Sequence, residues 1–476
     1  MDSSMDKNTF FNGLSKVFPH TPTASQNIAL QLLTEFLLSK NSSEKLFLLK
    51  GFAGTGKTSI INCLIQNLPS IGHKAVLLAP TGRASKVMSN LAKQQAFTIH
   101  KHIYFPKTNG KDFSFTLKVN KFKNTLFIVD EASMIADSSE HSFEQNSLLD
   151  NLITYVYSGQ NCKLLLMGDS AQLPPVNSDY SPALDIRNLE IRYNKEISHI
   201  ELDEVVRQEK KSGILYNATK IRELLFNFSF QKNFRFNIKN FKDIVRLTEG
   251  TEIQDAIENS YSHYGSEQTA IIVRSNKRAV LYNKQIRKVI LDNENDLSAG
   301  DLLMVVKNNY YWLKDSPEVS FIANGDTLEV LQIYAFRELY GFRFAEAKVQ
   351  LVDYPNHPPF DTVLLLDTLE SENPSLTYQE SNRLYEEVLL DYQDETSAYK
   401  KYLKVKENPF FNALQVKFSY AITCHKSQGG QWDAVFIEKP YLPNGIDENY
   451  LRWLYTALTR AVQKVYLINF QEDDFK

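Results

Sequence analysis

A glycine-rich run between an apolar segment and a helix-like one could hold phosphate groups. The run is Gly51-Phe-Ala-Gly-Thr-Gly-Lys-Thr58, and it follows the apolar segment 46–49. Glycines let backbone N–H groups turn inward around phosphate oxygens, and the following helix N-terminus adds a favourable dipole. Lys57 would reach the β- and γ-phosphates of ATP, and the Thr58 hydroxyl would hold Mg²⁺. The predicted phosphate-binding residues are Gly51, Gly54, Thr55, Gly56, Lys57, Thr58 and Ser59.

Two adjacent carboxylates follow a second apolar segment, Leu126-Phe-Ile-Val129. Asp130 would bind Mg²⁺ through the water shell of the metal. Glu131 would orient and deprotonate the attacking water, which distinguishes a hydrolase from a protein that only binds nucleotide. An acidic helix N-terminus is the alternative interpretation, but the position downstream of a phosphate loop favours the catalytic one.

A third apolar segment, 164–167, ends in Gly168-Asp-Ser-Ala-Gln172-Leu-Pro-Pro175. The Gln172 amide can donate and accept hydrogen bonds, so beside a γ-phosphate it could sense hydrolysis. An ordinary turn is the alternative. Because the carboxyl ends of parallel strands share one edge of a sheet, these three segments are expected to place their polar residues around one site.

The segment 101–124 combines positive charge with aromatic rings. Its lysines could meet phosphates and its aromatic faces could stack on bases, as in proteins that bind single-stranded nucleic acid. Asn109-Gly110 lies at its centre, which predicts a β-hairpin. A solvated hairpin whose rings pack on the domain is the alternative. Lys101 and Phe113 are the residues of this segment predicted to contact nucleic acid.

The composition is that of an ordinary soluble globular protein, with 43% hydrophobic and 23% charged residues among 476. Cys63, Cys162 and Cys424 are widely spaced, which favours reduced thiols over disulfides or a zinc site. We expect neither a signal peptide nor a membrane span, and a cytoplasmic location. The net charge of −3 means that any nucleic-acid interface must be locally positive.

Alternating apolar strands and helices predict an α/β protein. The expected parts are a first domain at 1–190 with a hairpin insertion at about 98–124, a second domain at 191–292 and 411–476, and an inserted antiparallel barrel with an acidic helical segment at 293–410. In the acidic stretch 370–394, the heptad spacing of Tyr378, Tyr385 and Tyr392 predicts one helical face. A packed or interface face is favoured, and a binding stripe is the alternative.

Further motifs accompany the ATPase residues. They are Thr23-Ala-Ser-Gln26, Ala79-Pro-Thr-Gly-Arg-Ala-Ser-Lys86, Val205-Val-Arg-Gln208, Ala421-Ile-Thr-Cys-His-Lys-Ser-Gln-Gly429 and Tyr455-Thr-Ala-Leu-Thr-Arg-Ala461. In this order they resemble the superfamily 1 DNA helicases of the RecD-like and Dda-like branch. The resemblance extends from about residue 23 to 462. The acidic stretch 370–394 matches none of the branch's motifs, and the chain lacks a recognisable nuclease constellation.

The resemblance implies two RecA-like P-loop domains, the first with a β-hairpin insertion and the second with a small SH3-like barrel. It implies that Gln26 reads the adenine edge, that Gly429 helps to bind nucleotide, and that the hairpin acts as a duplex-splitting pin. The implied catalytic residues are Lys57, Glu131, Gln172, Arg207 and Arg460. The implied contacts to the strand are Thr81, Arg83, Lys86, His100, Lys101, Phe113, Thr423, His425 and Lys426.

Arg207 and Arg460 lie far from Lys57 in sequence. A guanidinium supplied by a second domain stabilises charge on the transferring phosphoryl group only when the cleft closes, so ATP binding would pull the two domains together. We therefore expect a monomeric, Mg²⁺- and ATP-dependent helicase that moves 5′ to 3′ on single-stranded DNA and acts at single/double-strand junctions. Replication or repair proteins are further expected partners.

Two alternatives stay open. An RNA helicase or a protein-stripping translocase would share these motifs, because backbone tracking reads little base identity. An ATP-gated nucleic-acid clamp with little turnover is less favoured, because Asp130, Glu131 and both arginines are intact.

Overall fold

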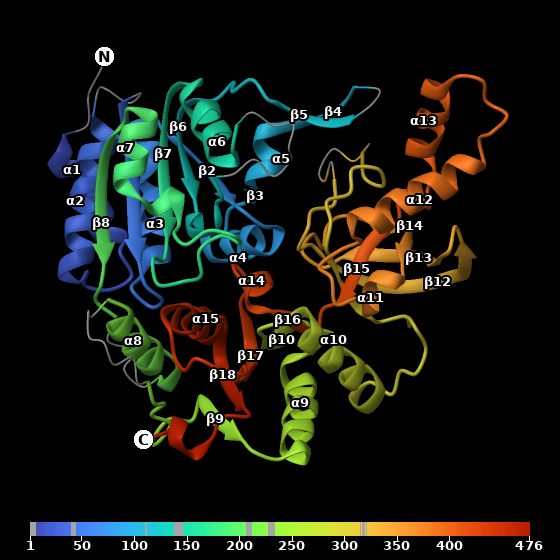
Figure 1. Ribbon diagram of the computed structural model, residues 1–476. Helices are drawn as coiled ribbons and strands as arrows, with labels where there is room; N and C mark the ends of the chain where they lie inside the picture. Colours follow the sequence, from blue (N-terminus) through green and yellow to red (C-terminus); the bar gives the residue numbers. More distant parts are fainter. Residues whose placement is uncertain are drawn as a thin grey trace.

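The computed structural model describes residues 6–39, 44–109, 112–137, 146–205, 212–226, 234–314, 316, 319 and 321–476, with backbone alone at 106–109 and 112–115. The chain forms two parallel sheets, a closed five-stranded barrel and a two-stranded hairpin. Figure 1 shows the first sheet above the second, with the barrel beside both. The expected α/β class, with a hairpin in the first domain and a barrel in the second, is confirmed.

The first sheet has the strand order β3-β2-β6-β7-β1-β8, and every neighbouring pair is parallel. Its strands are β1 (Lys45–Gly51), β2 (Lys74–Ala79), β3 (Ala96–Thr98), β6 (Lys123–Val129), β7 (Gln160–Gly168) and β8 (Glu196–Leu202). The central strands are continuous apolar runs because both faces of the sheet are covered. In β1, Phe47 and Leu49 belong to one buried cluster, and Leu46 and Leu48 to another.

Helices cover both faces of this sheet. On the face of Phe47 lie α1 (Lys7–Val17), α2 (Ala24–Leu38), α3 (Lys57–Asn67) and α4 (Gly82–Ala92). On the face of Leu46 lie α5 (Ile99–Ile103), α6 (Leu148–Tyr157) and α7 (Ile186–Tyr193). This layering leaves the carboxyl ends of the strands as the edge that faces the second sheet (Figure 1).

The second sheet has the order β16-β10-β17-β18-β9 and is also parallel throughout. Its strands are β9 (Ile244–Leu247), β10 (Thr269–Val273), β16 (Ala421–Thr423), β17 (Trp432–Glu438) and β18 (Ala461–Ile468). Its helices are α8 (Gly213–Phe226), α9 (Gly250–Tyr264), α10 (Asn276–Gln285), α14 (Cys424–Ser427) and α15 (Glu448–Leu458). In Figure 1, α14 and α15 lie at the junction with the first sheet.

The barrel closes through β11 (Leu302–Val305), β12 (Thr327–Leu339), β13 (Phe342–Leu351), β14 (Phe360–Leu365) and β15 (Leu414–Phe418). One of its pairings, β14 with β15, is parallel, so the expectation of a purely antiparallel barrel is wrong. The chain leaves β14 through α11 (Asp367–Glu370), α12 (Tyr378–Leu390) and α13 (Ala398–Glu407) before it returns as β15. This detour allows β15 to enter in the parallel sense.

The acidic stretch 370–394 packs on the barrel. Leu384 and Val388 of α12 form a buried cluster with Phe344 of β13 and Leu365 of β14. The predicted single face of tyrosines is wrong: α12 ends at Leu390, and Tyr378 is 81% exposed. The amphipathic face of the helix is aliphatic instead, because those residues fill the groove on the barrel.

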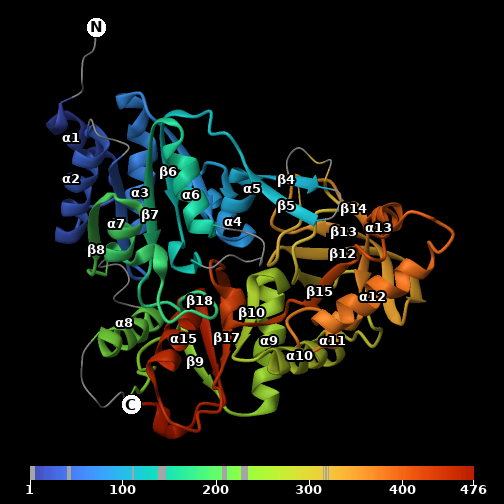
Figure 2. The ribbon, with the colours of Figure 1, turned by 45° about the horizontal axis from the view of Figure 1, so that its top comes forward.

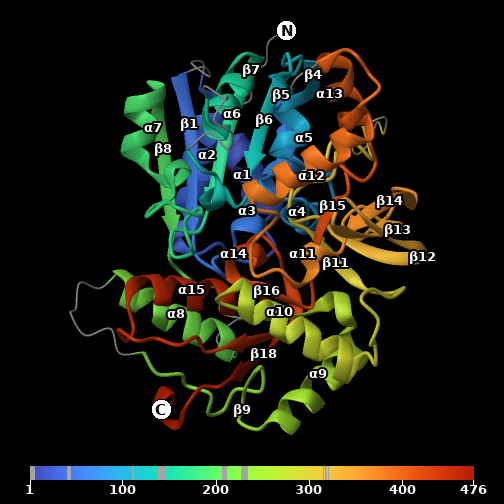
Figure 3. The same cartoon turned by 45° about the vertical axis from the view of Figure 1, so that its right-hand side comes forward.

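The hairpin consists of β4 (Tyr104–Asn109) and β5 (Asp112–Leu117), which pair antiparallel with Asn109 opposite Asp112. Figures 1, 2 and 3 agree that it projects from the first sheet domain toward the barrel and α13. The turn at 110–111 lies outside the described residues.

Two strands cross the domain boundaries expected from sequence. β8 (Glu196–Leu202) belongs to the first sheet although it lies beyond residue 190, and β15 (Leu414–Phe418) belongs to the barrel although it lies beyond residue 410. β15 alternates buried and half-buried residues, whereas β8 buries Ile197 and Leu202 on opposite faces of the sheet. Each pattern is compatible with several sheets, so only tertiary pairing assigns the strand.

Candidate nucleotide-hydrolysis site

The predicted phosphate loop connects β1 to α3 at the carboxyl edge of the first sheet. Gly54 and Gly56 have φ angles of 75° and 84°, which side chains disfavour. Lys57 begins α3, and its Nζ donates hydrogen bonds to the carbonyls of Phe52, at 3.1 Å, and Gly51. Thr58 and Ser59 occupy the first turn of α3. The loop therefore has the strand, turn and helix geometry that a phosphate site needs.

Gln26 is fully buried beside this loop. Its Nε2 donates to the Thr55 carbonyl at 2.9 Å, and its Oε1 accepts from the Thr23 backbone at 3.0 Å. The Thr23 hydroxyl accepts from the Gln26 N–H in return, which forms a capping box at the start of α2. In this structure Gln26 forms a hydrogen bond that holds the phosphate loop at Thr55. Its contact with adenine stays a prediction.

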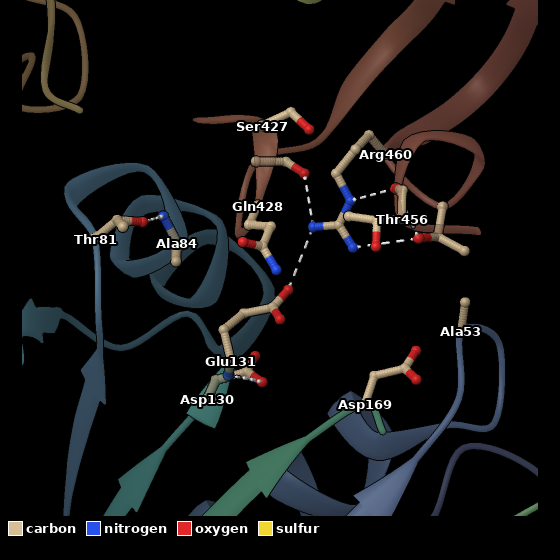
Figure 4. Close-up of polar contacts among 12 residues, drawn as sticks. Ala53, Thr81, Ala84, Asp130, Glu131, Asp169, Ser427, Gln428, Thr456 and Arg460 are labelled. Carbon is tan, nitrogen blue, oxygen red and sulfur yellow. Dashed lines mark hydrogen bonds and ion pairs between the residues drawn. The ribbon is translucent and has the colours of Figure 1, made fainter. Parts of the chain in front are cut away.

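Asp130 and Glu131 follow β6 directly. Loss of solvent around the Asp130 carboxyl, together with the neighbouring Glu131, raises its pKa to about 6, although Lys57 opposes this. Glu131 has a left-handed φ of 51°, and its N–H donates to Asp130 Oδ1 at 2.7 Å. This sharp turn separates the two carboxylates and aims Glu131 toward the second sheet domain (Figure 4).

Arg460 reaches Glu131 from the second sheet domain (Figure 4). Its Nη1 lies 3.4 Å from Glu131 Oε1, and its side chain is only 5% exposed. Its Nε donates to the Thr456 carbonyl at 3.1 Å, and Nη1 also donates to the Gly430 carbonyl at 3.3 Å. The second domain thus orients a guanidinium at the carboxylate predicted to activate water, and a buried pair of opposite charges spans the junction.

The segment after β7 is held by side chains of the second domain. The Leu173 N–H donates to Thr456 Oγ1 at 2.9 Å, and Gln428 Nε2 donates to the Leu173 carbonyl at 2.7 Å. Arg452 Nη1 donates to the Ser170 carbonyl at 2.6 Å. Gln172 is 5% exposed, and its buried Oε1 has no hydrogen-bond partner in the part of the chain that the structure describes. An unpartnered acceptor is costly in a protein interior, so this oxygen is a candidate to bind a ligand.

Sequence reasoning missed several residues at this junction. Tyr455 donates to Asp169 at 2.7 Å and accepts from the Ala53 N–H at 3.0 Å. Thr456, Arg452 and Gln428 hold the segment after β7. Tyr455 and Thr456 stand in the motif 455–461, but the motif alone does not show that they face the other domain.

The oxygen donors fit a hard cation such as Mg²⁺. Asp130 supplies a poorly solvated carboxylate at the strand end, and Thr58 supplies a hydroxyl group in the first turn of α3. Among the described residues, no group of three or more His, Cys, Asp or Glu side chains is arranged to hold a metal. Mg²⁺ is usually bound by one or two carboxylates together with phosphate oxygens and water, so this donor set suits a metal that arrives with nucleotide.

Three residues predicted to contact DNA instead join parts of the protein. Arg83 stacks over Trp432 of β17 at 3.9 Å and donates to the Glu267 carbonyl at 3.3 Å. Lys86 donates to the Val352 carbonyl at 2.7 Å, and Lys101 donates to the Tyr354 hydroxyl at 2.9 Å. In this arrangement these cations connect the first domain to the second sheet and the barrel, and their contact with DNA stays a prediction.

The structure brings other predicted residues to the junction. Thr81 caps α4 by accepting from the Ala84 N–H at 3.2 Å, and Gly429 packs so close that an added Cβ would lie 2.6 Å from Ala84 Cβ. Thr423 precedes α14, which carries His425 and Lys426. Thr81 lies two residues after the end of β2 in the first sheet, and Thr423 is the last residue of β16 in the second.

Lys426 donates to Asn324 Oδ1 in the barrel, and burial lowers its pKa to about 8. Loss of solvent also lowers the pKa of His425. His100 lies in α5 with its ring 5.7 Å from Tyr104. Phe113 lies in β5, but its side chain is outside the described part of the chain, as is all of Arg207.

Among the described residues, no helix is long and apolar enough to cross a bilayer. The AAA domain family matches residues 35–178, and the UvrD-like helicase C-terminal domain family matches residues 418–468. These two matches cover the phosphate loop with both carboxylates, and the connection between α15 and β18 that supplies Arg460.

The chain is 24% identical to the ATP-dependent DNA helicase Dda of Enterobacteria phage T4, over 88% of this chain and 93% of the relative. It is 28% identical to the ATP-dependent RecD2 DNA helicase of Deinococcus radiodurans, over 38% of this chain and 22% of the relative. A crystal structure of the Pif1 helicase from Bacteroides with ADP-AlF3 and ssDNA covers 96% of this chain and 95% of its own at 16% identity, with a TM-score of 0.42. A TM-score of that size does not by itself establish a common fold.

The family matches at both halves of the site and the full-length similarity to Dda agree with the geometry of a hydrolysis site shared by two sheets. These similarities support a superfamily 1 helicase that is similar to the RecD-like and Dda-like type.

Proposed function

We propose that this protein is a Mg²⁺- and ATP-dependent helicase that moves 5′ to 3′ along single-stranded DNA and separates duplex at single/double-strand junctions. It would act as a monomer, because both halves of its hydrolysis site come from one chain. The contact between Arg460 and Glu131 carries the proposal, since it joins a candidate arginine finger to a candidate general base across the two sheets.

Each residue has a defined task in hydrolysis. Lys57 would leave the carbonyls of Gly51 and Phe52 to bind phosphate oxygens. Glu131 would take a proton from the attacking water. Arg460 would exchange Glu131 for the γ-phosphate and stabilise its developing charge. Mg²⁺ held near Thr58 and Asp130 would supply further neutralisation of phosphate charge when bound.

Strand movement follows from where these contacts lie. Thr81 and Thr423 lie at the ends of β-strands in different sheets. A DNA strand that contacted both residues would be bound by the two domains that share the ATP site. Closing and opening the cleft would change the spacing between the grips by a hinge motion. Because the two grips differ in structure, the motion can be directional.

Unwinding of forked duplexes that carry either a 5′ or a 3′ single-stranded tail tests the proposal. We expect ATP-dependent separation of the 5′-tailed substrate, and none with the Lys57→Ala variant. Unwinding only from the 3′ tail would overturn the polarity. ATPase stimulation by RNA but not by DNA strands would favour the RNA helicase, and equal ATPase rates with and without oligonucleotide would overturn the coupling.

A further inference from the structure

The hydroxyl group of Tyr455 connects three segments of the chain. Tyr455 lies in α15 of the second domain and is 1% exposed. Its hydroxyl accepts from the Ala53 N–H of the phosphate loop at 3.0 Å and donates to Asp169 Oδ2 at 2.7 Å. Both partners belong to the first domain, so this buried hydroxyl is satisfied across the junction.

Asp169 is itself a costly group to bury. It is 1% exposed, and burial raises its pKa, while Lys57, Tyr455 and the Ala171 N–H oppose that rise and Glu131 adds to it. Its second oxygen accepts from the Ala171 N–H at 2.9 Å. A buried carboxylate contributes little net stability, because desolvation offsets its hydrogen bonds. Replacing a buried charged group and its partner by apolar residues of similar volume is often neutral or stabilising, so net stability is a weak reason for this pair.

The geometry around Asp169 points to a role in positioning. The segment 169–173 carries Gln172, whose buried Oε1 has no hydrogen-bond partner among the described residues. Its backbone is already bound by Thr456 and Arg452 of α15. Tyr455 adds a third contact from the same helix and extends it to the phosphate loop. The helix α15 therefore connects both sides of the nucleotide site to the second domain.

We propose that Tyr455 is a positioning residue for ATP hydrolysis, whose hydroxyl links the phosphate loop at Ala53 to Asp169 and makes the segment 169–173 follow the second domain. This inference rests on the proposed ATPase function. Among the described contacts, the hydroxyl bonds to neither Glu131 nor Arg460, the two residues expected near the γ-phosphate. It therefore acts through the two segments that it holds.

The Tyr455→Phe variant tests this role, with Tyr450→Phe as a matched control. Tyr450 is 2% exposed on the same helix but lines a separate hollow with Phe236 and Phe470. We expect Tyr455→Phe to lower the DNA-stimulated kcat about tenfold or more, the scale of one lost hydrogen bond to a charged group. The Kd for a fluorescent non-hydrolysable ATP analogue should change by less than about threefold, because the remaining loop N–H groups stay in place. Tyr450→Phe should leave both values near those of the wild type.

Two further readouts distinguish positioning from packing. With Tyr455→Phe, the acidic limb of the kcat–pH profile should move to higher pH, because Asp169 loses a donor that favours its charged form while Lys57 and Glu131 still face it. In a double-mutant cycle with Asp169→Ala, the combined loss should not exceed the larger single loss. Additive losses, an unchanged kcat, or a loss that follows thermal stability alone would overturn the proposal.

Hydrogen–deuterium exchange on the nucleotide-free protein separates this inference from the proposed function. Peptides that contain Ala53 and residues 169–173 should exchange faster in Tyr455→Phe than in wild type or Tyr450→Phe. Asp169→Ala removes the acceptor of the same link if Tyr455→Phe does not fold. A wild type without ATPase activity would refute the proposed function and the hydrolytic role together, whereas unchanged exchange alone would refute the link.

Discussion

The guanidinium of Arg460 lies 3.4 Å from the carboxylate of Glu131, although the two residues belong to different sheets and are separated by most of the chain. Because Arg460 is held by the carbonyls of Thr456 and Gly430, its direction is set by the second domain. The pair occupies the candidate base. In the proposed mechanism, nucleotide competes with Glu131 for Arg460, which would couple ATP binding to the geometry of the junction.

Replacement of Arg460 by alanine should lower the DNA-stimulated kcat by roughly 10³-fold or more, the scale found for arginine fingers. ATP affinity should change far less, because the phosphate loop remains intact. Stopped-flow phosphate release and equilibrium nucleotide binding measure the two effects. Arg337→Ala is the control. It removes a 53% exposed cation of β12 that pairs with Glu346 of β13, and its kcat should stay near that of the wild type. A loss confined to KM would remove Arg460 from the transition state.

The Glu131→Gln variant should bind ATP and lose hydrolysis by a factor on the order of 10² or more, because the amide cannot accept the proton of the attacking water. It should also release Arg460 from an ionic partner. Steady-state phosphate release with saturating oligonucleotide checks this, beside a binding measurement on the same sample. Near-normal turnover would assign the general base elsewhere.

Proton release should accompany binding of Mg-ATP. The folded pKa of Asp130 is about 6, above its ordinary value of 3.8, so the free folded protein holds this proton more tightly than the unfolded chain. Its contribution to stability is therefore greatest below pH 4 and is lost as the pH rises through 6. Bound cation favours the ionised form, so the thermal shift caused by Mg-ATP should shrink as the pH falls from 7.5 to 5.5.

Asp130→Asn provides the control for this pH dependence. The variant has no carboxyl to titrate, so its smaller Mg-ATP thermal shift should vary less with pH than that of the wild type. An equally steep pH dependence in the variant would assign the proton to another group. Differential scanning fluorimetry at constant ionic strength is sufficient for the comparison.

A side chain at position 82 should destabilise the contact between the barrel and the first domain. A Cβ at Gly82 would lie 2.2 Å from Asp326 Oδ1, an atom that is buried without a partner. Asp326 is also 3.5 Å from the Lys101 Nζ, so the clash falls on a buried ionic contact. Gly82→Ala should lower the free energy of unfolding by about 1–3 kcal/mol, the usual range for overpacking.

Gly250→Ala is the matched control, because nothing lies within 4 Å of a Cβ at that position. Chemical denaturation of both variants measures the difference, and hydrogen exchange near residues 323–327 locates it. If Gly82→Ala is as stable as Gly250→Ala, the barrel does not hold its position on α4 in solution.

The segments with the strongest local patterns were predictable from sequence. The apolar segments 126–129 and 164–167 lie within the strands β6 and β7, because continuous apolar runs are local properties. The tyrosine face expected at 378–392 failed because heptad spacing does not reveal where a helix ends. The domain boundaries expected at 190 and 410 misplaced β8 and β15, because sheet membership depends on which strands pair in the folded protein.

By itself, the sequence determined the phosphate loop, the carboxylate pair and the order of the motifs, because these depend on residue type and on spacing within one turn or strand end. Only the tertiary structure decided that Arg460 faces Glu131, that Tyr455 bridges Ala53 and Asp169, and that Lys101 meets Asp326. Those contacts join residues that lie far apart in the chain. Their partners depend on how two sheets and a barrel pack together, and no local pattern encodes that packing.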